Sequence, residues 1–493
     1  MNKKKVVIIG AGIGGLATAI QLAQKGFKVS IFEKNSKPGG RCQVINKDGH
    51  VFDTGPTMYL FPKIYEDFFS SIGEDVHKHL ELLKADPIYR LHFPDHTSLL
   101  LTPQIEKMRT SFEKLEPGSF VRFQKFLETA KKQYSLAQSS IIQNDLRTPQ
   151  QYFNLQNLFQ LLKSNALENH CSFAKKFFTH PHLIAACTFQ DSYLGLNPFE
   201  SPAIYSIFSY SELHDGSYLP KGGMYQVILA LEKIALAHGV KIQYTAPVKN
   251  IVAHDSKVSG ILLENNKQIT ADVVLANSDL SYTYNHLLPK NSYGSRLHKK
   301  TYSCSAISFH WGIDRTYPQL QTHNLFFSPK YRESFEQVVN KKDPPMNPHF
   351  YIQAPARTDS SRTPHNQDTL SVMVPINHIY DDNPVDWGFY AAQLRSYIFS
   401  RLHNLGIKNI KQHIKFEICH LPQDWKEFCN LPYGSVYGLH HHLPQLGYLR
   451  PKRQHAKYKN LFFVGASTHP GSGLPTVLLS SKFTTKRILE YAG

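Results

Sequence analysis

Short apolar runs alternate with stretches of helical periodicity at the start of the chain. Residues 6–9 form a branched apolar run that predicts a buried strand, and apolar positions at helical spacing over 16–23 predict a helix directly after it. Gly26 is placed to end that helix, and the apolar run at 29–32 predicts the next strand. The order of strand, helix and strand indicates an α/β fold.

Further strands are predicted in the middle of the chain, and a last strand and helix near its end. A run at 461–464 predicts a buried strand, and 477–489 has a helical pattern. Residues 71–215 are largely helical in pattern, with few alternating stretches. Glu264-Asn265-Asn266 predicts a hairpin turn within the central strands. The central strands are predicted at 240–244, 248–254, 258–263, 269–275, 303–313 and 370–375.

A glycine-rich segment, Gly10-Ala11-Gly12-Ile13-Gly14-Gly15, joins the first predicted strand to the first helix. Gly10 permits a tight turn, Gly12 lets the backbone approach a pyrophosphate, and Gly15 lets the helix pack closely on the strand. Phosphates would lie at the positive N-terminus of the helix. The second strand delivers Glu33, ~20 residues further on, where a carboxylate can accept hydrogen bonds from ribose hydroxyls. The pattern therefore predicts a dinucleotide site that disfavours the phosphorylated ribose of NADP.

Two further segments favour FAD over NAD. In Pro38-Gly39-Gly40-Arg41 the glycines can pass close to a diphosphate while Arg41 adds a positive charge beside it. In the second segment, 52–57, Gly55-Pro56 predicts a turn beside the isoalloxazine. The alternative is a polar loop and a strand-ending turn that hold no ligand.

A second glycine-rich turn, over 465–475, precedes the last predicted helix. Backbone N–H groups at that helix N-terminus could stabilise negative charge at the N1/O2 edge of a reduced flavin. The two ends of the chain are thus predicted to form one FAD site. The candidate cofactor-binding residues are Gly10, Gly12, Gly14, Gly15, Glu33, Gly39, Gly40, Arg41, Gly55, Pro56, Thr57, Val248, Gly465, Ala466, Gly473, Leu474 and Pro475.

With these segments, the chain resembles the bacterial-type carotenoid desaturases, which act on phytoene or dehydrosqualene and share their flavin-binding architecture with amine oxidases. The resemblance covers essentially the whole length. In the C-terminal signature, Ser472 stands where the family usually has alanine or glycine, and Ser480-Ser481-Lys482 where it has Ser-Ala-Lys. Besides the glycine-rich segments, the resemblance rests on 52–56, Glu116-Pro117-Gly118-Ser119, 218–224, 302–306, Ala354-Pro355-Ala356, Asp359-Ser360-Ser361, Tyr433-Gly434-Ser435 and 464–482.

The resemblance implies an α/β fold with a Rossmann-like FAD-binding domain that is discontinuous in sequence. A mixed α+β substrate domain and a helical, membrane-associating subdomain would complete it. We expect the FAD-binding parts at 1–70, 216–299 and 431–493, the helical substrate and membrane-associating region at 71–215, and the substrate domain at 300–430.

The implied reaction removes two hydrogens from a C–C bond next to a conjugated polyene, one as hydride to flavin N5 and one as a proton. Charge developing on carbon would spread through the polyene, so no strong side-chain base is required, and the sequence singles none out. The implied electron acceptor is a membrane quinone or molecular oxygen. Four ionisable residues near the matched segments are more readily interpreted as turn or packing residues: Arg41, Asp191, Glu212 and His469.

Composition and charge indicate where in the cell the protein is expected. Six cysteines are scattered along 493 residues without a Cys-x-x-Cys pair, which predicts a reduced, cytosolic protein without a disulfide framework or structural zinc. The net charge of +17 suits an anionic membrane face, whereas no basic helix or zinc module supports nucleic-acid binding. His440-His441-His442 lacks spaced partners for a metal and is predicted to be a solvated strand or loop. With no apolar segment of ~20 residues and no signal-peptide pattern, we expect a cytoplasmic protein peripheral to the inner face of the membrane.

Residues 150–190 carry the local pattern for membrane contact. Aromatic residues and leucines recur there at helical spacing, with lysines at the edge. The alternative is an ordinary helical subdomain whose apolar stripe faces the core. The resemblance favours the membrane, because the polyene substrates of the family are dissolved in lipid. The residues concerned are Tyr152, Leu155, Leu158, Phe159, Leu161, Leu162, Phe173, Lys175, Lys176, Phe177 and Phe178.

Three functions compete. The leading one is FAD-dependent desaturation of phytoene, with dehydrosqualene as the closest alternative substrate. The second is a flavin-dependent carotene isomerase or terminal-methyl oxidase, which resembles the chain in the same segments. The third is a non-catalytic prenyl-binding protein of the same fold, such as the Rab escort and GDP-dissociation-inhibitor proteins. Glu33, Gly39-Gly40-Arg41 and the C-terminal glycine turn argue against this third function, because a flavin explains them. The oligomeric state is left open.

Overall fold

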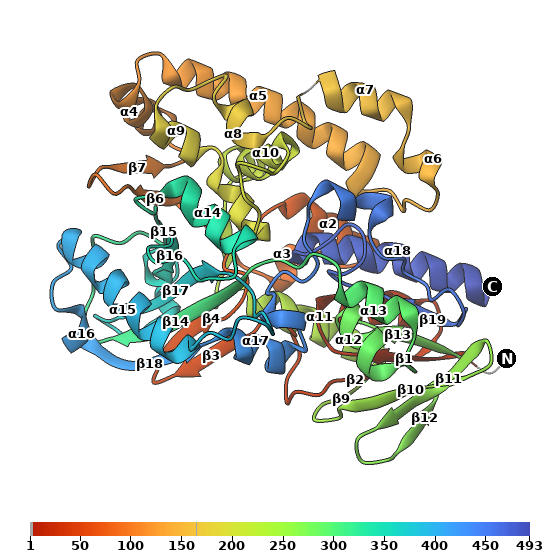
Figure 1. The fold of residues 1–493 in the computed structure, drawn as a ribbon. Coiled ribbons are helices and arrows are strands. Elements are labelled where there is room, and N and C mark those ends of the chain that lie inside the picture. The colour runs from red at the N-terminus through yellow and green to blue at the C-terminus, as the bar shows by residue number, and fades with distance from the viewer. Residues whose placement is uncertain (1–2, 164) are drawn as a thin grey trace.

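A five-stranded parallel sheet joins the start, the middle and the end of the chain. In this computed structural model, which describes residues 3–163 and 165–493, β1 is the central strand and pairs with β2 on one side and β13 on the other. The strands predicted at 6–9, 29–32 and 461–464 are confirmed and lie in this one sheet (Figure 1). In spatial order the strands are β19 (Leu461–Phe463), β13 (Val273–Ala276), β1 (Lys5–Ile9), β2 (Lys28–Phe32) and β9 (Lys241–Gln243).

Both faces of this sheet are buried, because alternate residues of a strand point to opposite sides. Val6 and Ile8 pack in a core shared with three helices, whereas Val7 and Ile9 pack in a second core shared with a small antiparallel sheet. The three helices are α1 (Ile13–Gln24), α11 (Tyr225–Ala237) and α18 (Leu474–Ala492), and the antiparallel strands are β10 (Val248–His254), β11 (Lys257–Leu263) and β12 (Gln268–Thr270).

The single strand predicted at 269–275 is wrong: the structure has two strands there. β12 ends at Thr270 in the antiparallel sheet, and β13 begins at Val273 in the parallel sheet. Between them Asp272 binds the start of β1, because its carboxylate accepts from the Lys5 backbone N–H at 2.6 Å and its own N–H donates to Lys5 O at 2.9 Å. The apolar pattern continues across the break because Ile269 and Ala271 pack at the edge of the core that also holds Val274.

A seven-stranded, largely antiparallel sheet forms the second unit. The predicted strands at 303–313 and 370–375 are confirmed as β14 and β17, which pair along their full lengths. Two strands from within 71–215, β6 and β7, extend the sheet at one edge, where β6 runs parallel to β15. In spatial order the strands are β18 (Ile414–His420), β14 (Ser305–Ile313), β17 (Asp368–Ile376), β16 (Phe350–Gln353), β15 (His323–Phe326), β6 (Tyr89–His92) and β7 (Ser98–Leu101).

Helices between residues 105 and 210 form a layer at the top of Figure 1. Their inner side is a core rich in phenylalanine, in which Phe112, Phe126, Phe173 and Phe178 are at most 1% exposed. Phe173 and Phe178 therefore face the core, which matches the alternative to membrane contact for this half of the predicted stripe. The helices are α4 (Ile105–Leu115), α5 (Ser119–Ala137), the π-helix η1 (Gln138–Ile142), α6 (Pro149–Tyr152), α7 (Leu155–Lys163), α8 (His170–Ala174), α9 (Pro181–Ala186) and α10 (Ser206–Tyr210).

Short elements connect the two sheets and the helical layer. Among the helices of the described ranges, none combines the length and the apolar character needed to cross a bilayer. The connecting elements include β3 (Val44–Lys47), β4 (His50–Asp53), α2 (Pro62–Ser71), α3 (Val76–His79), β5 (Leu82–Lys84), η2 (Phe189–Leu194), η4 (Ser211–Asp215), β8 (Tyr218–Pro220), α12 (Leu280–Tyr282), α13 (Ser292–His298), α14 (Tyr331–Asn340), α15 (Trp387–Asn404), α16 (Ile410–His413) and α17 (Pro422–Cys429).

Candidate functional site

The first glycine-rich turn joins β1 to α1. Gly10 has a φ of +96°, in the region that favours glycine, and its N–H donates to Phe32 O at 2.8 Å. A Cβ on Gly15 would lie 2.3 Å from Gly10 O, so α1 can approach β1 only because that position is glycine. Cβ atoms on Gly12 and Gly14 would lie 2.9 Å and 2.6 Å from the side chain of Asn277. The turn is therefore packed tightly on both sides.

Glu33 follows the last residue of β2 and is 5% exposed. Its Oε2 accepts from the Ala11 N–H at 2.7 Å, and its Oε1 accepts from the Asn35 N–H at 2.9 Å. Two backbone donors thus fix the orientation of the carboxylate beside the glycine turn, where its remaining lone pairs can accept further hydrogen bonds.

The Gly39–Arg41 and Gly55 segments lie against the same turn. Gly39 donates its N–H to Ala11 O at 2.9 Å. A Cβ on Gly55 would lie 2.0 Å from Arg41 O, so the two segments are in direct backbone contact. The guanidinium of Arg41 donates to Val436 O at 2.9 Å, which connects this wall to the C-terminal part of the chain.

The second glycine-rich turn leads into α18. Gly471 and Gly473 have φ of +138° and +116°, and α18 begins at Leu474 as predicted by the helical pattern. A Cβ on Gly471 would lie 2.6 Å from Nε2 of His441. Because the first N–H groups of a helix have no intrahelical acceptor, the start of α18 presents donors and a positive dipole end.

These turns line one cavity with a volume of about 980 Å³. Its other end is apolar and lies under α6 and α7, where Phe153 and Leu158 line the cavity and are also 61% and 44% exposed at the surface. The cavity therefore reaches the surface beside α7. Of the predicted cofactor-binding residues, those that line it are Gly10, Gly12, Gly14, Glu33, Gly39, Gly40, Arg41, Gly55, Pro56, Thr57, Val248, Gly465, Ala466, Gly473, Leu474 and Pro475, whereas Gly15 packs behind Gly10.

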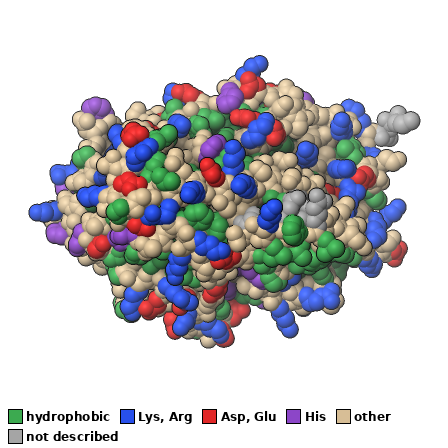
Figure 2. Space-filling model, turned by 90° about the horizontal axis from the view of Figure 1, so that it is seen from above, with side chains coloured by type: hydrophobic (Ala, Val, Ile, Leu, Met, Phe, Trp, Pro, Cys, Tyr) green, Lys and Arg blue, Asp and Glu red, His purple; other side chains and the backbone are tan. Residues whose placement is uncertain are grey.

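The outer surface at this end of the cavity is also apolar. Figure 2 shows hydrophobic side chains gathered on this face, with Lys and Arg side chains around them. We call the group the α7 patch, and its residues are 40–81% exposed. It consists of Phe153, Leu155, Leu158, Phe159, Leu162, Leu443 and Leu449.

Comparison with known proteins identifies the family. Residues 13–489 match the family model of the flavin containing amine oxidoreductases. The chain belongs to this family. Solved structures of the same fold include putrescine oxidase, with a TM-score of 0.65 at 13% identity over 99% of both chains. A Rab GDI from Plasmodium falciparum has a TM-score of 0.54 at 13% identity, covering 99% of this chain and 98% of that chain.

Curated relatives within the family act on carotenoid precursors. A zeta-carotene-forming phytoene desaturase of Myxococcus xanthus is 38% identical, over 99% of this chain and 94% of its own. A phytoene desaturase of Fusarium fujikuroi is 35% identical, over 100% of this chain and 90% of its own. A 4,4'-diapophytoene desaturase of Staphylococcus haemolyticus is 31% identical, over 98% of both. The chain is therefore a carotenoid desaturase of the amine oxidoreductase family.

FAD is the cofactor of this flavoenzyme, and the residues of the cavity fit it. Gly10 and Gly39 have φ of +96° and +121°, which bring bare backbone to the cavity wall where a side chain would obstruct a pyrophosphate. Glu33 offers a carboxylate oriented by two backbone N–H groups beside the first glycine turn, as an acceptor for ribose hydroxyls requires. The start of α18 offers N–H donors on the same cavity.

The sequence analysis missed one segment of this flavoenzyme site, Asn277-Ser278-Asp279, which lines the cavity directly after β13. The Asn277 amide donates to Gly10 O at 3.3 Å, and the carboxylate of Asp279 accepts from the Ser467 hydroxyl at 2.8 Å. Burial raises the pKa of Asp279. Polar residues directly after a buried parallel strand are a signal for a ligand site, because the carboxyl ends of such strands meet at one edge of the sheet.

The expectation that His440-His441-His442 is solvated is wrong for two of the three residues. His440 is 8% and His441 is 3% exposed. The Nε2 of His441 accepts from the Ser472 N–H at 3.0 Å, and burial lowers its pKa well below the usual range, so the ring is neutral. In the described ranges no three metal-binding side chains gather here or elsewhere. The imidazole instead fixes the second glycine turn.

Two of the four ionisable candidates have structural partners that explain them. Asp191 lies 2.9 Å from Nδ1 of His170, and both side chains are fully buried away from the cavity lining. His469 donates from Nε2 to the carbonyls of Ile141 and Asn144, at 2.9 and 3.1 Å. The third, Arg41, lines the cavity, and the fourth, Glu212, is buried behind it.

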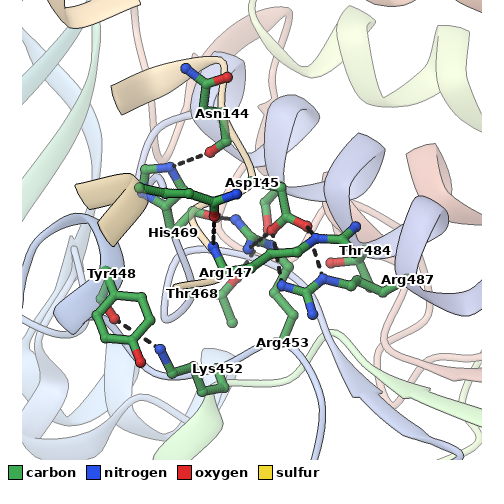
Figure 3. Close-up of polar contacts among 12 residues, drawn as sticks. Asn144, Asp145, Arg147, Tyr448, Lys452, Arg453, Thr468, His469, Thr484 and Arg487 are labelled. Atoms are coloured by element: carbon green, nitrogen blue, oxygen red, sulfur yellow. Dashed lines mark hydrogen bonds and ion pairs between the residues drawn. The ribbon is translucent and has the colours of Figure 1, made fainter. Parts of the chain in front are cut away.

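A cluster of charges beside His469 joins the helical layer to the flavin unit. Figure 3 shows Asp145 surrounded by Arg147, Arg453 and Arg487. Burial acts to raise the pKa of Asp145, but the hydrogen bonds and charges of Arg487 and Arg453 hold it below its usual range. Because residues 144–147 follow η1, this cluster fixes the end of the cavity wall that η1 contributes.

Proposed function

We propose that the protein introduces C=C bonds into phytoene, using FAD as the oxidant. One observation carries this proposal: the cavity is lined at one end by the two glycine turns and at the other by apolar side chains that reach the surface. A linear polyene suits such a cavity, because it needs a continuous apolar path and offers no polar group for recognition. The names of the phytoene desaturases among its relatives support this choice of substrate.

A shorter polyene, dehydrosqualene, is the second candidate substrate. The relative named as a 4,4'-diapophytoene desaturase supports it at lower identity. The apolar lining would accept either chain, because burial of CH₂ groups depends on area and not on chain ends.

We propose that the cavity-lining glycine turns and their neighbours hold FAD. In this assignment Glu33 binds the ribose of the adenosine half, Gly39, Gly40 and Arg41 lie along the diphosphate, and Gly15 acts only through packing. The proposed contacts are Gly10, Gly12, Gly14, Glu33, Gly39, Gly40, Arg41, Gly55, Pro56, Thr57, Val248, Gly465, Ala466, Gly473, Leu474 and Pro475.

FAD, when bound, supplies the hydride acceptor of the reaction. The residues of the protein would position the polyene and exclude water from the cavity. Leu60, Phe61 and Ile64 line the cavity and form a buried apolar cluster with Ile207, against which Phe208 packs. These side chains would hold the polyene extended and keep water away from the reacting carbons.

We further propose that the α7 patch rests on the inner face of the cytoplasmic membrane and takes the substrate from it. Leu155 and Phe159 are 81% and 66% exposed, and a contiguous exposed apolar patch such as this one marks an interaction site. The net charge of +17 would favour anionic lipid around the patch. A membrane quinone or oxygen would then be at hand to reoxidise the flavin.

The test uses purified protein with FAD and liposomes, offered phytoene and dehydrosqualene in parallel. Longer conjugation shifts the absorption of the product to the red, and extraction identifies it. We expect conversion of phytoene. Conversion of dehydrosqualene alone would show that dehydrosqualene, and not phytoene, is the substrate. A flavin-loaded protein that converts neither would overturn the desaturase proposal in favour of isomerisation or oxidation of a coloured carotene, and a protein that retains no flavin would favour prenyl binding.

A further inference from the structure

Three side chains form a hydrogen-bonded chain from the cavity wall into the helical layer. Tyr89 on β6 and Tyr193 on η2 line the cavity, and their hydroxyl oxygens are 2.7 Å apart. The Tyr193 hydroxyl donates to Oε1 of Glu212 at 2.8 Å. Glu212 lies on η4 and is fully buried. The chain thus connects the cavity to a carboxyl group behind its wall.

This chain begins next to the segment that we assign to the flavin. The Tyr89 hydroxyl lies 3.1 Å from Sδ of Met58. The neighbouring Tyr351 hydroxyl donates to Oγ1 of Thr57 at 3.1 Å. Thr57 and Met58 directly follow the Gly55-Pro56 turn and line the same cavity. A carbon of the substrate beside that turn would therefore have a hydroxyl cluster next to it.

Glu212 is an expensive residue to bury, because a carboxylate without a cation is poorly stabilised away from water. Burial raises its pKa to about 7, while hydrogen bonds from Tyr193 and Gln190 act to lower it. Tyr89 and Tyr351 face it from β6 and β16, and burial raises the pKa of both, with a smaller contribution from the charge of Glu212. On its own element, His214 and Asp215 bind each other. At neutral pH the carboxyl group can therefore both accept and release a proton.

We propose that Tyr89, Tyr193 and Glu212 form a relay that accepts the proton released from the substrate during desaturation. The inference rests on the proposed function. As one carbon gives up hydride, the C–H bond of its neighbour breaks, and that electron pair becomes the second bond of the new C=C. The proton passes to the Tyr89 oxygen, the Tyr89 proton to Tyr193, and the Tyr193 proton to the Glu212 carboxylate. Tyr89 is the catalytic residue, and Tyr193 and Glu212 act through it.

The other buried ionisable groups near the cavity are poorer acceptors. Burial and the charge of Arg453 lower the pKa of His469 to about 3, which makes it a weak base. Asp191 is occupied by His170 and is not among the described residues that line the cavity. Of these three groups, Glu212 combines a route of hydroxyl groups to the cavity with a pKa matched to neutral pH.

The test compares kcat and KM against pH for the flavin-loaded wild type and for Glu212→Gln, Tyr193→Phe and the double variant. The relay works only with Glu212 ionised, so we expect the wild-type kcat to rise with pH through about 7. Each single variant should lower kcat about 100-fold, with KM little changed and the rise through neutral pH abolished. The double variant should be no slower than either single variant. Tyr331→Phe is the matched control, because Tyr331 is a half-buried tyrosine that is not among the described cavity-lining residues.

A stability measurement separates a failed relay from a failed fold. The folded-state pKa of Glu212 lies above its ordinary value, so the carboxyl ionises first in the unfolded chain and stability falls as pH rises from about 4 to about 7. Glu212→Gln should therefore melt at the same or a higher temperature than the wild type at pH 8, although it is slower. A Glu212→Gln enzyme with wild-type kcat and pH profile would overturn the relay alone. A wild type that desaturates neither polyene would overturn the proposed function, and the relay with it.

Discussion

The cavity lies between a wall built from the ends of the parallel sheet and a wall built from the helical layer. In the first wall the contacts are made by backbone: Gly15 and Gly55 stand where a Cβ would meet a carbonyl oxygen at 2.3 and 2.0 Å. In the second wall the contacts are made by bulk, through side chains such as Ile207 and Phe208 of α10. The first wall needs particular residues at particular positions, whereas the second needs only apolar side chains of adequate size. A cofactor of fixed shape would suit the first wall, and an apolar substrate would suit the second.

The largest effect is expected from filling the sheet wall. Gly15→Val should prevent α1 from packing on β1 and destabilise the protein by more than about 3 kcal/mol, because the added carbon meets Gly10 O. Loss of flavin absorbance and of a cooperative thermal transition would show it. Gly26→Ala is the control: it places a side chain at positive φ, but into open space with no atom to meet, and should cost about 1 kcal/mol. Equal effects of the two substitutions would contradict the role of the close contact.

The charge cluster that joins the two walls should come next. Asp145→Asn leaves Arg453, which is 6% exposed, without its carboxylate and should destabilise the protein by about 3 kcal/mol at pH 7. The folded-state pKa of Asp145 is lowered, so its contribution is present above the ordinary carboxyl pKa of about 4 and is lost as pH falls below it. Thermal melts of the wild type and the variant should therefore converge at low pH. A gap that persists at pH 2 would show that the carboxylate charge is not responsible.

A smaller effect is expected for cofactor retention. Glu33→Lys removes the oriented acceptor and adds a bulky positive group, and should weaken FAD binding by about 2 kcal/mol. Equilibrium titration of the apoprotein with FAD measures this. Glu128→Lys makes the same charge change on the exposed side of α5 and should bind FAD like the wild type. Unchanged binding by Glu33→Lys would contradict the placing of the ribose.

The smallest effect is expected on the outer side of the helical wall. Leu155→Ser together with Phe159→Ser should reduce binding to anionic vesicles about tenfold, because two exposed side chains lose contact with lipid. Vesicle co-sedimentation measures this, and the melting temperature should stay the same. Phe389→Ser, on α15, changes an equally exposed phenylalanine at 65% and serves as the control. Equal losses of vesicle binding from the double variant and from Phe389→Ser would show that the α7 patch is not the membrane-binding surface.

The sequence predicted the sheet wall well because its signals are local. The turn at Gly10 directly follows β1, and the helix that starts near Gly473 is the next regular element after β19, so periodicity and glycine placement were sufficient. The break at Asp272 was missed because the apolar residues Ile269 and Ala271 before it pack against the same core as Val274 after it. Asn277-Ser278-Asp279 were missed although the predicted end of the strand before them, at 275, lies next to its end in the structure at Ala276.

The helical wall was harder to predict because its partners are distant in sequence. Phe159 and Phe173 have the same pattern, but only the second meets Phe126 of α5 and is buried. His441 was expected in solvent and is buried by Arg450 and the turn at Ser472. Likewise, Tyr89, Tyr193 and Glu212 come from three elements and become a chain of hydroxyl groups only when β6 joins the large sheet.

The parallel sheet also sets an order of events during synthesis. β1 and α1 emerge first, but α18, which packs against α1, and β19, which pairs with β13, emerge last. At a synthesis rate of roughly 5–20 residues per second, the second glycine turn is synthesised tens of seconds after the first. For the later part of that time the apolar helical layer is already outside the ribosome while the pocket beneath it is unfinished. The nascent chain should therefore depend on chaperones, and flavin should enter only after translation ends.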